Sequence, residues 1–357
     1  MTRVYLHIGA PKTGTTYLQN RLAANRSTLA EHQVSYPAVR VGDVDHFRPA
    51  LDLMSMTWND TIDPSGQWKA AVAKARRSEG SAILSHELLA AARPPAIAQA
   101  ARDLAGTELH VVFSVRDLGR QIPAAWQESI KLGKTWSMRK FLRRLENRPT
   151  MFFWRSQHIP DVLTRWGEIV PPERIHLVTV PPPGSDRGLL LVRACQALGV
   201  SPDWLPQDRS ERSNPSLGID ETAVIRALNK KLKGSELSRQ DHTRLVKLAI
   251  AQGALASRPD MRMASLSPES QAWARGLARE WNDWVRASGI DVVGDLEDLT
   301  PANPDPDWED PDKPRPARMA DAAVDALSTA VLEAARMSGE ASLPSRLGRS
   351  LRALRSR

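Results

Sequence analysis

The amino-acid sequence predicts an α/β protein with a mainly parallel sheet flanked by helices and a helical C-terminal half. Three observations support this fold class. Short apolar runs rich in β-branched residues alternate with longer runs of helical periodicity up to about residue 185, and beyond it the pattern is almost entirely helical. The composition, 41% apolar and 25% charged, is typical of a globular protein. Strands separated by helices indicate crossover connections and therefore parallel pairing.

The strand and helix segments follow from these patterns in chain order. The expected strands cover residues 3–8, 81–85, 109–114 and 175–180. The expected helices cover residues 15–24, 67–79, 95–105, 119–131, 137–146, 159–169, 187–199, 218–232, 240–255 and 268–288.

The chain is expected to divide into an α/β domain over residues 1–300, an extended linker over 301–317 and a helical tail over 318–357. Residues 301–316 carry six prolines and five acids, a composition typical of a solvated extended segment. Near the C-terminus, four leucines share one helical face among arginines: Leu343, Leu347, Leu351 and Leu354. A basic amphipathic tail of this kind suits weak contact with a membrane surface.

The charge and the cysteine content narrow the classes of partner. The formal net charge is +8, and all of the excess lies in residues 1–300, which favours an anionic partner such as a nucleotide, phosphate or sulfate. The sequence has no Lys/Arg block, zinc-finger spacing or aromatic RNA-binding motif, so we expect no nucleic acid partner. One cysteine, Cys195, fits a reducing compartment, and we expect a cytoplasmic protein without a signal peptide, membrane span or metal site.

A phosphate-binding loop is the strongest local signal in the sequence. Residues 9–16 (GAPKTGTT) follow the first strand directly and open a helix. Glycines let the backbone curl closely, and the free N–H groups and dipole of the helix start attract an oxyanion. Thr15 and Thr16 add hydroxyl donors and Lys12 adds a positive charge. In the ATPase loop G-x-x-x-x-G-K-[ST] the lysine would stand at the position of Thr15. The charge of Lys12 is therefore expected to contact a different atom of the nucleotide.

The element P-K-T-G-T-T resembles the 5′-phosphosulfate loop of sulfotransferases that use 3′-phosphoadenosine 5′-phosphosulfate (PAPS), most closely the bacterial members. The resemblance implies a P-loop-type sheet and transfer of a sulfuryl group, with 3′-phosphoadenosine 5′-phosphate (PAP) as the product. It implies that Lys12 contacts the bridging oxygen and the transferred group. It assigns the nucleotide contacts at this loop to Pro11, Lys12, Thr13, Gly14, Thr15 and Thr16.

A second element follows the third predicted strand and reads Arg116-Asp117-Leu118. It resembles the family's 3′-phosphate element R-[DN]-P, and a guanidinium fork suits a phosphate dianion. The family has a serine eight residues after the arginine, where this chain has Ala124. One hydroxyl contact is therefore missing or replaced, by water, Arg120 or Gln121, which lowers the expected affinity for the nucleotide.

A third element is the loop SERSNPS over residues 210–216. It is similar to an R-x-N-x-S loop that closes over the nucleotide in bacterial sulfotransferases. The similarity implies nucleotide contacts from Arg212, Asn214 and Ser216. The alternative interpretation is an N-cap cluster for the next helix.

The acceptor must lose a proton during transfer, so a base is expected near the loop. The second predicted strand ends at His86 and Glu87, level with Lys12 at the carboxyl edge of the sheet. We favour Glu87 as the base, which resembles the family's S-x-E pattern, with His86 second and His46 as a further candidate. Aromatic side chains of the acceptor region are Trp58, Trp126, Trp136 and Trp154, each of which could equally fill the core.

The expected function is transfer of a sulfuryl group from PAPS to a hydroxyl or amine of an unidentified glycan, lipid-linked or small-metabolite acceptor. Two alternatives remain open at this point. One is a P-loop kinase that uses ATP and Mg²⁺, against which the position of Lys12 argues. The other is a binding module for a nucleotide or glycan without catalysis, which Ala124 in place of serine leaves open.

Overall fold

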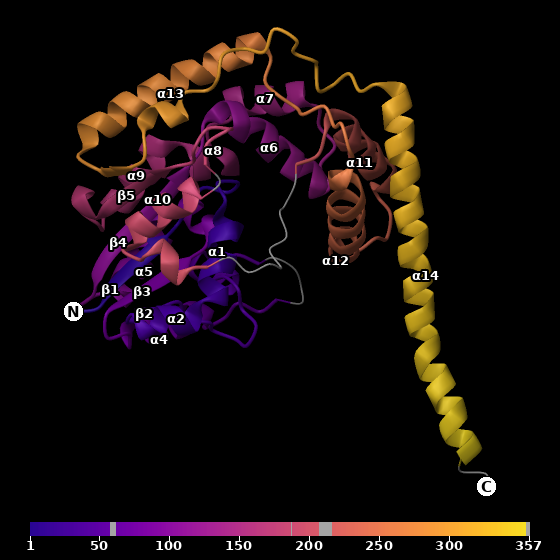
Figure 1. The fold of residues 1–357 in the computed structure, drawn as a ribbon, viewed down its shortest axis with the longest axis horizontal. Helices are drawn as coiled ribbons and strands as arrows, with labels where there is room; N and C mark the ends of the chain where they lie inside the picture. The colour runs from indigo at the N-terminus through magenta and orange to yellow at the C-terminus, as the bar shows by residue number, and fades with distance from the viewer. Residues whose placement is uncertain (58–61, 187, 207–215, 355–357) are drawn as a thin grey trace. The chain divides into compact units, whose positions relative to one another are not determined.

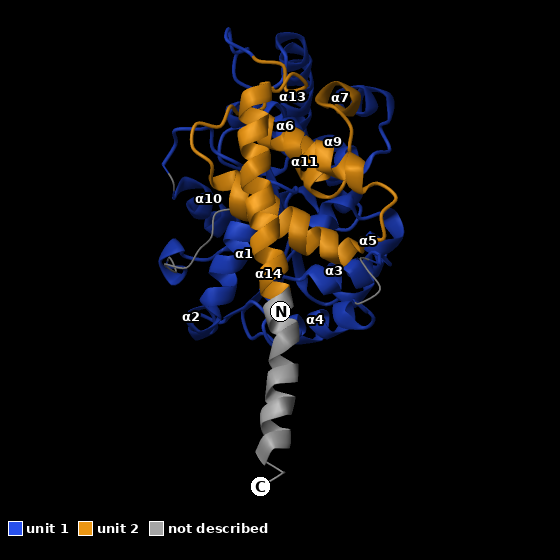
Figure 2. Cartoon of the chain, turned by 90° about the vertical axis from the view of Figure 1, so that its right-hand side faces the viewer, with its two compact units in different colours: residues 1–125, 142–213, 266–308 blue, residues 126–141, 214–265, 309–357 orange. Residues whose placement is uncertain are grey.

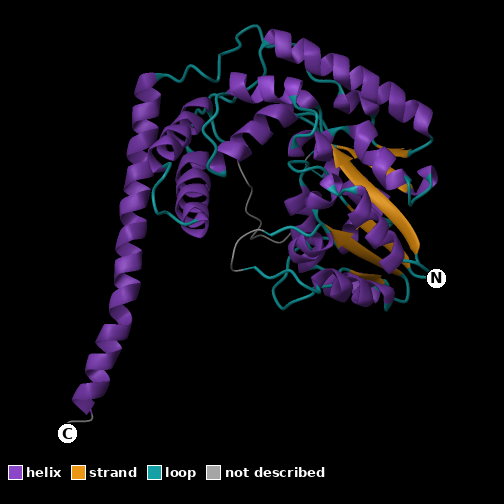
Figure 3. Ribbon diagram, turned by 180° about the vertical axis from the view of Figure 1, so that it is seen from behind, coloured by secondary structure: helices purple, strands orange, loops and turns teal. Residues whose placement is uncertain are grey.

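In this computed structural model the described residues form a six-stranded, entirely parallel sheet. Helices flank the sheet (Figures 1 and 3). The strand order is β2-β3-β1-β4-β5-β6. The predicted α/β class is therefore confirmed. The strands are β1 (Arg3–His7), β2 (Val34–Ser35), β3 (Ser81–Ser85), β4 (Glu108–Val115), β5 (Ile175–Thr179) and β6 (Asp291–Val293).

The structure describes residues 1–57, 62–186, 188–206 and 216–354, with side chains up to residue 337. Most helices begin and end within three residues of the predicted positions. The α-helices before β5 are α1 (Thr15–Ala24), α2 (Arg26–Glu31), α3 (Phe47–Leu53), α4 (Gln67–Arg76), α5 (Pro94–Asp103), α6 (Leu118–Lys131), α7 (Met138–Asn147), α8 (Phe152–Gln157) and α9 (Ile159–Gly167). Those after β5 are α10 (Leu189–Leu198), α11 (Ile219–Leu232), α12 (Arg239–Asp241), α13 (Pro268–Ser288) and α14 (Pro316–Leu354).

One face of the sheet packs against α1, α2 and α10. Tyr5, Ile83, Val112 and Val178 stand on this face at alternate positions of four neighbouring strands, as the register of the parallel pairs requires. Leu18 and Leu22 of α1, Leu29 of α2 and residues 191–198 of α10 cover them. Helix α10 ends at Gly199, whose positive φ of 65° and closeness to the Tyr5 hydroxyl require a residue without a Cβ.

The chain divides into two compact units, each assembled from three segments of sequence (Figure 2). The first unit contains residues 1–125, 142–213 and 266–308, and it carries the whole sheet. The second contains residues 126–141, 214–265 and 309–357. These two units differ from the division at residues 300 and 317 that the sequence suggested. The sequence-based division stays a prediction.

Three features differ from the sequence-based expectation. Strands β2 and β6 are only two and three residues long, too short to show an alternating pattern. The expected helix over 240–255 is instead the short α12 followed by a π-helix over His242–Ala254. Part of the expected solvated linker is anchored in the second unit, where Asp312 is 14% exposed, pairs with Arg226 at 2.9 Å and accepts hydrogen bonds from the N–H groups of Met138 and Arg139.

Candidate functional site at the carboxyl edge of the sheet

The three best-defined sequence elements meet at one edge of the sheet. Because the strands are parallel, their carboxyl ends share an edge, and β1 lies between β3 and β4. The phosphate loop follows β1, Glu87 follows β3 and Arg116 follows β4. The chain moves to one side of β1 for β2 and β3 and to the other side for β4, which makes β1 the point where ligands bind in open parallel sheets.

The phosphate loop is a tight left-handed turn before α1. Lys12 has φ of 71° and Gly14, the residue preceding the helix, has φ of 85°. The Thr13 hydroxyl donates to the Ala10 carbonyl at 2.7 Å, and the Ala10 N–H donates to the Ser114 carbonyl at 2.8 Å. No side chain caps α1 and its first turn holds no acid. The first turn therefore presents its N–H groups and the positive end of the helix dipole to an anion.

Two buried glutamines hold this loop in place through the carbonyl of Pro11. The Pro11 carbonyl accepts hydrogen bonds from Gln121 Nε2 at 2.5 Å and from Gln157 Nε2 at 3.1 Å. Gln121 lies on α6 and Gln157 on α8, so helices from two distant parts of the sequence hold the loop. The sequence analysis named Gln121 only as a replacement contact to the 3′-phosphate and did not single out Gln157, because a buried glutamine in a helix has no pattern that distinguishes it from a surface one.

Glu87 lies half-buried in a 3-10 turn directly after β3. Its Oε2 accepts a hydrogen bond from Gln19 Nε2 of α1 at 3.4 Å. Burial opposes its charge, but the neighbouring His86 and hydrogen bonds from its own backbone, Gln19 and the Thr15 hydroxyl outweigh burial and lower the pKa of Glu87. Glu87 is therefore a carboxylate at neutral pH and able to accept a proton. The Thr15 contact places it against the phosphate loop.

The two histidines predicted as alternative bases have structural partners. His86 Nδ1 accepts the Leu88 N–H at 3.2 Å and so caps the 3-10 turn. His46 Nε2 donates to the Pro37 carbonyl at 2.9 Å, and its Nδ1 accepts the Ser85 N–H at 3.1 Å. Burial lowers the pKa of His46 to about 4. With both ring nitrogens bound to backbone groups, His46 is suited to holding the end of β3.

A buried histidine that the sequence analysis did not single out connects the three central strands. His7, at the end of β1, is 1% exposed. Its Nδ1 lies 2.7 Å from the Ser85 hydroxyl of β3 and its Nε2 lies 3.1 Å from the Ser114 hydroxyl of β4. Burial lowers its pKa to about 4, so the ring is neutral. A Cβ on Gly9 would clash with the His7 ring, which places His7 directly beneath the loop.

Arg116 is the cation of the second element, and Gln121 connects it to the loop. Arg116 Nε donates to Gln121 Oε1 at 3.0 Å, while the amide of Gln121 bonds Pro11 as described above. Burial, and secondarily Arg120, lower the pKa of Arg116 to about 10, so it stays protonated at neutral pH. Asp117 caps α6 by accepting the Arg120 N–H at 2.9 Å. Arg120 also pairs with Asp117 and donates to the carbonyls of Pro181 and Val180.

The remaining predicted residues lie elsewhere or outside the described residues. Arg212 and Asn214 of the third element, and Trp58, lie outside them, and Ser216 is exposed. Trp126 and Trp136 belong to the second unit, where the Trp126 indole donates to the Trp136 carbonyl at 3.2 Å. Trp154 belongs to the first unit and lines a cavity.

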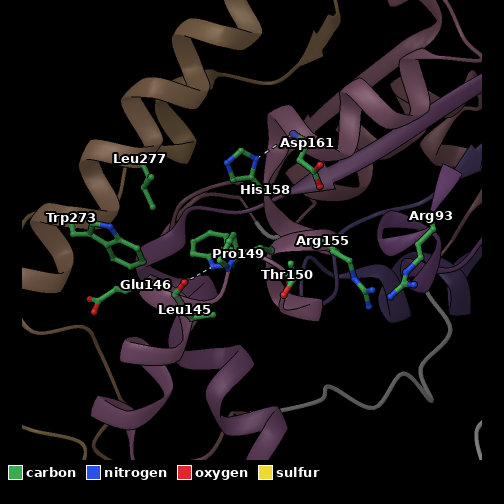
Figure 4. Close-up of a pocket in the computed structure, with 11 residues that line it drawn as sticks. Arg93, Leu145, Glu146, Pro149, Thr150, Arg155, His158, Asp161, Trp273 and Leu277 are labelled. Atoms are coloured by element: carbon green, nitrogen blue, oxygen red, sulfur yellow. Dashed lines mark hydrogen bonds between the residues drawn. The ribbon is translucent and has the colours of Figure 1, made fainter.

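This cavity of about 740 Å³ lies in the first unit, between α8 and α13 (Figure 4). Trp154 and Trp273 meet edge to face with their ring centres 6.1 Å apart. Arg155 and His158 line it from α8 and the start of α9. Gln157 of the same short helix α8 bonds the Pro11 carbonyl, so one helix contributes to both the cavity wall and the support of the loop.

Comparisons with known proteins add nothing to this description: no protein-family model, curated protein or solved structure matches the chain. Over the part of the chain that the structure describes, no cluster of His, Cys, Asp and Glu has the arrangement of a metal site. None of the helices in that part has the length and apolar character to cross a membrane.

Proposed function

We propose that this protein transfers a sulfuryl group from PAPS to a hydroxyl or amine of an acceptor, on a sheet of the P-loop type. One observation carries the proposal: the loop with Lys12 lies between β1 and an uncapped α1, while β3 and β4 bring Glu87 and Arg116 to the same edge. An anion cradle, a nearby guanidinium and a carboxylate base are the groups that this reaction requires.

The residues of the site fit the nucleotide. The N–H groups of the first turn of α1, together with Thr15 and Thr16, would hold the 5′-phosphate, and Arg116 would hold the 3′-phosphate. Lys12, in a left-handed conformation, would face the bridging oxygen, where negative charge grows during transfer. The bound nucleotide supplies the activated sulfuryl group.

Glu87 is the residue best placed to take the proton from the acceptor. Its pKa is lowered, so it is ionised at neutral pH, and its contact with Thr15 places it beside the loop. A base must lie within hydrogen-bond reach of the group that loses the proton, and an acceptor bound next to the loop would meet this condition. Both ring nitrogens of His46 are hydrogen-bonded to backbone groups, so His46 has no part in the proposed chemistry.

Nucleotide selectivity tests the proposal against the kinase alternative. PAP at a hundredfold excess over its dissociation constant should stabilise the folded state by about 2.7 kcal/mol. A thermal-shift titration with PAP, ATP and ATP plus Mg²⁺ measures this. Stronger stabilisation by ATP, or dependence on Mg²⁺, would contradict the sulfotransferase proposal. PAP binding without turnover of PAPS over a broad set of acceptors would support the binding-module alternative instead.

A further inference from the structure

Two arginines of the first unit, Arg93 and Arg155, share a feature that the proposed nucleotide site does not explain. The pKa of Arg155 is lowered, first by burial and second by the nearby positive charge of Arg93. Figure 4 shows the two side chains extending alongside one another at one end of the cavity. Among the described residues, no carboxylate forms an ion pair with either of them, and Nε of Arg155 is buried without a hydrogen-bond partner. Arg93 is exposed and Arg155 half-buried, and an anion bound between their guanidinium groups would offset the repulsion between the two charges.

The arginine pair lies where two cavities adjoin. Both residues line the cavity of about 740 Å³ described above and a second cavity of about 890 Å³. The acids of the second cavity have partners of their own, since Asp52 accepts the Trp68 N–H at 2.8 Å and Asp103 accepts the Trp68 indole at 2.9 Å. Glu146 of the first cavity lies at the end away from the arginines (Figure 4).

The first cavity also has an aromatic wall, in which Trp273 lies at the end away from the arginines (Figure 4). Trp154 is almost fully buried and its indole donates to the Leu145 carbonyl at 2.8 Å, which fixes the ring. Trp273 of α13 stands nearly perpendicular to it at 83°. Such a corner of two indoles packs against the faces of rings, whether sugar or aromatic.

Hydrogen bonds hold helix α8, which carries Arg155, in a defined position. Arg165 donates to the Arg155 carbonyl at 2.6 Å and to the Ala90 carbonyl at 3.1 Å, which ties α8 to the turn that begins at Glu87. At the other end of α8, Gln157 bonds the loop carbonyl of Pro11. Helix α8 therefore connects Arg155 to the elements that carry Glu87 and Pro11.

We propose that Arg93 and Arg155 form an anion subsite that selects acidic, ring-shaped acceptors, with the ring against Trp154 and Trp273. The role of the bound molecule as an acceptor rests on the proposed function, whereas the preference of the subsite for an acidic ring does not. The shared ligand chemistry is a ring bearing a carboxylate or a similar anionic group, from either a sugar acid or an aromatic acid.

Direct binding of matched compounds to the full chain, without nucleotide, tests the subsite. The probes are methyl glucuronide against methyl glucoside, and 4-nitrobenzoate against 4-nitrobenzamide, titrated by ligand-observed NMR. In at least one pair the acid should bind about tenfold or more tightly than its neutral partner. This ratio corresponds to the lower end of the free energy of a hydrogen bond to a charged group. The pair with the larger preference identifies the kind of ring.

Arg93→Gln and Arg155→Gln should each reduce this acid preference severalfold and leave the neutral compounds unaffected. Arg279→Gln is the matched control, because Arg279 is exposed on α13 and lines neither cavity. Thermal unfolding of each variant verifies that it folds. Equal binding of acids and neutral partners, or a preference that both arginine variants retain, would overturn the subsite. The PAP titration is independent, so failure of the subsite and failure of the proposed function give different results.

Discussion

Lys12 is the residue on which the proposed chemistry depends most. It is half-buried in the loop and held in a left-handed conformation, which a lysine rarely adopts without a compensating interaction. Lys12 lies three residues before the first residue of α1, so in the proposed mechanism its charge and the helix N-terminus would act on the same anion. A residue that stabilises charge only as it develops affects the rate of transfer more than binding of the nucleotide.

We predict that Lys12→Ala lowers the rate of sulfuryl transfer by about 10²–10³-fold, the usual cost of removing a donor to developing charge. PAP binding should weaken much less. Turnover of PAPS to PAP, with a pool of candidate acceptors, provides the measurement. Lys140→Ala, at an exposed position of α7, is the control. A variant that keeps the rate of the unmodified protein would remove Lys12 from the mechanism.

For Glu87 we predict that Glu87→Gln abolishes most turnover while the affinity for PAP changes little, because the amide cannot accept a proton. The lowered pKa of Glu87 also predicts that the rate stays high at mildly acidic pH and falls only below the ordinary carboxyl range. Glu79→Gln, at an exposed site, is the control. A large loss of PAP affinity in Glu87→Gln would indicate a structural role.

His7 is expected to position the loop. Replacing it with alanine leaves a cavity and removes one hydrogen-bond partner from each of two serine hydroxyls, which should lower the free energy of unfolding by about 2–4 kcal/mol. PAP affinity should fall as well, since the loop lies on the His7 ring. His32→Ala, at an exposed position, provides the comparison. A destabilised variant with unchanged PAP affinity would limit His7 to a role in the sheet.

At the scale of elements, helix α6 decides how the nucleotide's 3′-phosphate would be held. Asp117 caps the helix, Gln121 links Arg116 to the loop, and Arg120 is tied to backbone carbonyls. The side chains considered as replacements for the missing serine, Arg120 and Gln121, are thus already engaged. Ala124 lies one helical turn beyond Gln121 and is partly exposed.

We predict that Ala124→Ser tightens PAP binding by about 1.5–3 kcal/mol if the new hydroxyl reaches the 3′-phosphate. Calorimetry with PAP and with adenosine 5′-phosphate isolates this contact, because only PAP carries the 3′-phosphate. Ala125→Ser, the next residue along the helix, is the matched control. An equal change for both nucleotides would mean that Ala124 does not face that phosphate.

The elements show which features a single sequence reveals. The four longer strands and the loop at residues 9–16 were predictable, because apolar β-branched runs and a Gly/Lys/Thr turn are local signals. Strands β2 and β6 were not, since two or three residues carry no period. His7, Gln157 and the contact of Gln121 with the loop were also missed, because they depend on partners between 78 and 146 residues away in the sequence.

At the scale of the whole molecule, two buried neutral histidines make stability depend on pH. His7 and His46 have pKa values near 4 in the folded protein and near 6.5 when unfolded. The unfolded chain therefore binds protons first as the pH falls, and acid favours unfolding. Each ring should lower the free energy of unfolding by on the order of 2 kcal/mol between about pH 6.5 and 5.

Urea unfolding at several pH values between about 7.5 and 5 measures this dependence. His46→Gln should flatten the pH profile by the contribution of one ring. A slope that survives replacement of both His7 and His46 would assign the acid sensitivity to other groups.

The interleaving of the two units in the sequence has a consequence for biosynthesis. As the ribosome releases the chain from the N-terminus, β1 can pair with β3 and then β4 long before β6 emerges. The first unit still lacks α13 and β6 until residue 293 has been made, and the second lacks α14 until the very end. A nascent chain interrupted near residue 265 therefore carries every residue assigned to the nucleotide, but neither unit is complete, so its central strands must persist with unfinished surroundings while the remainder is synthesised.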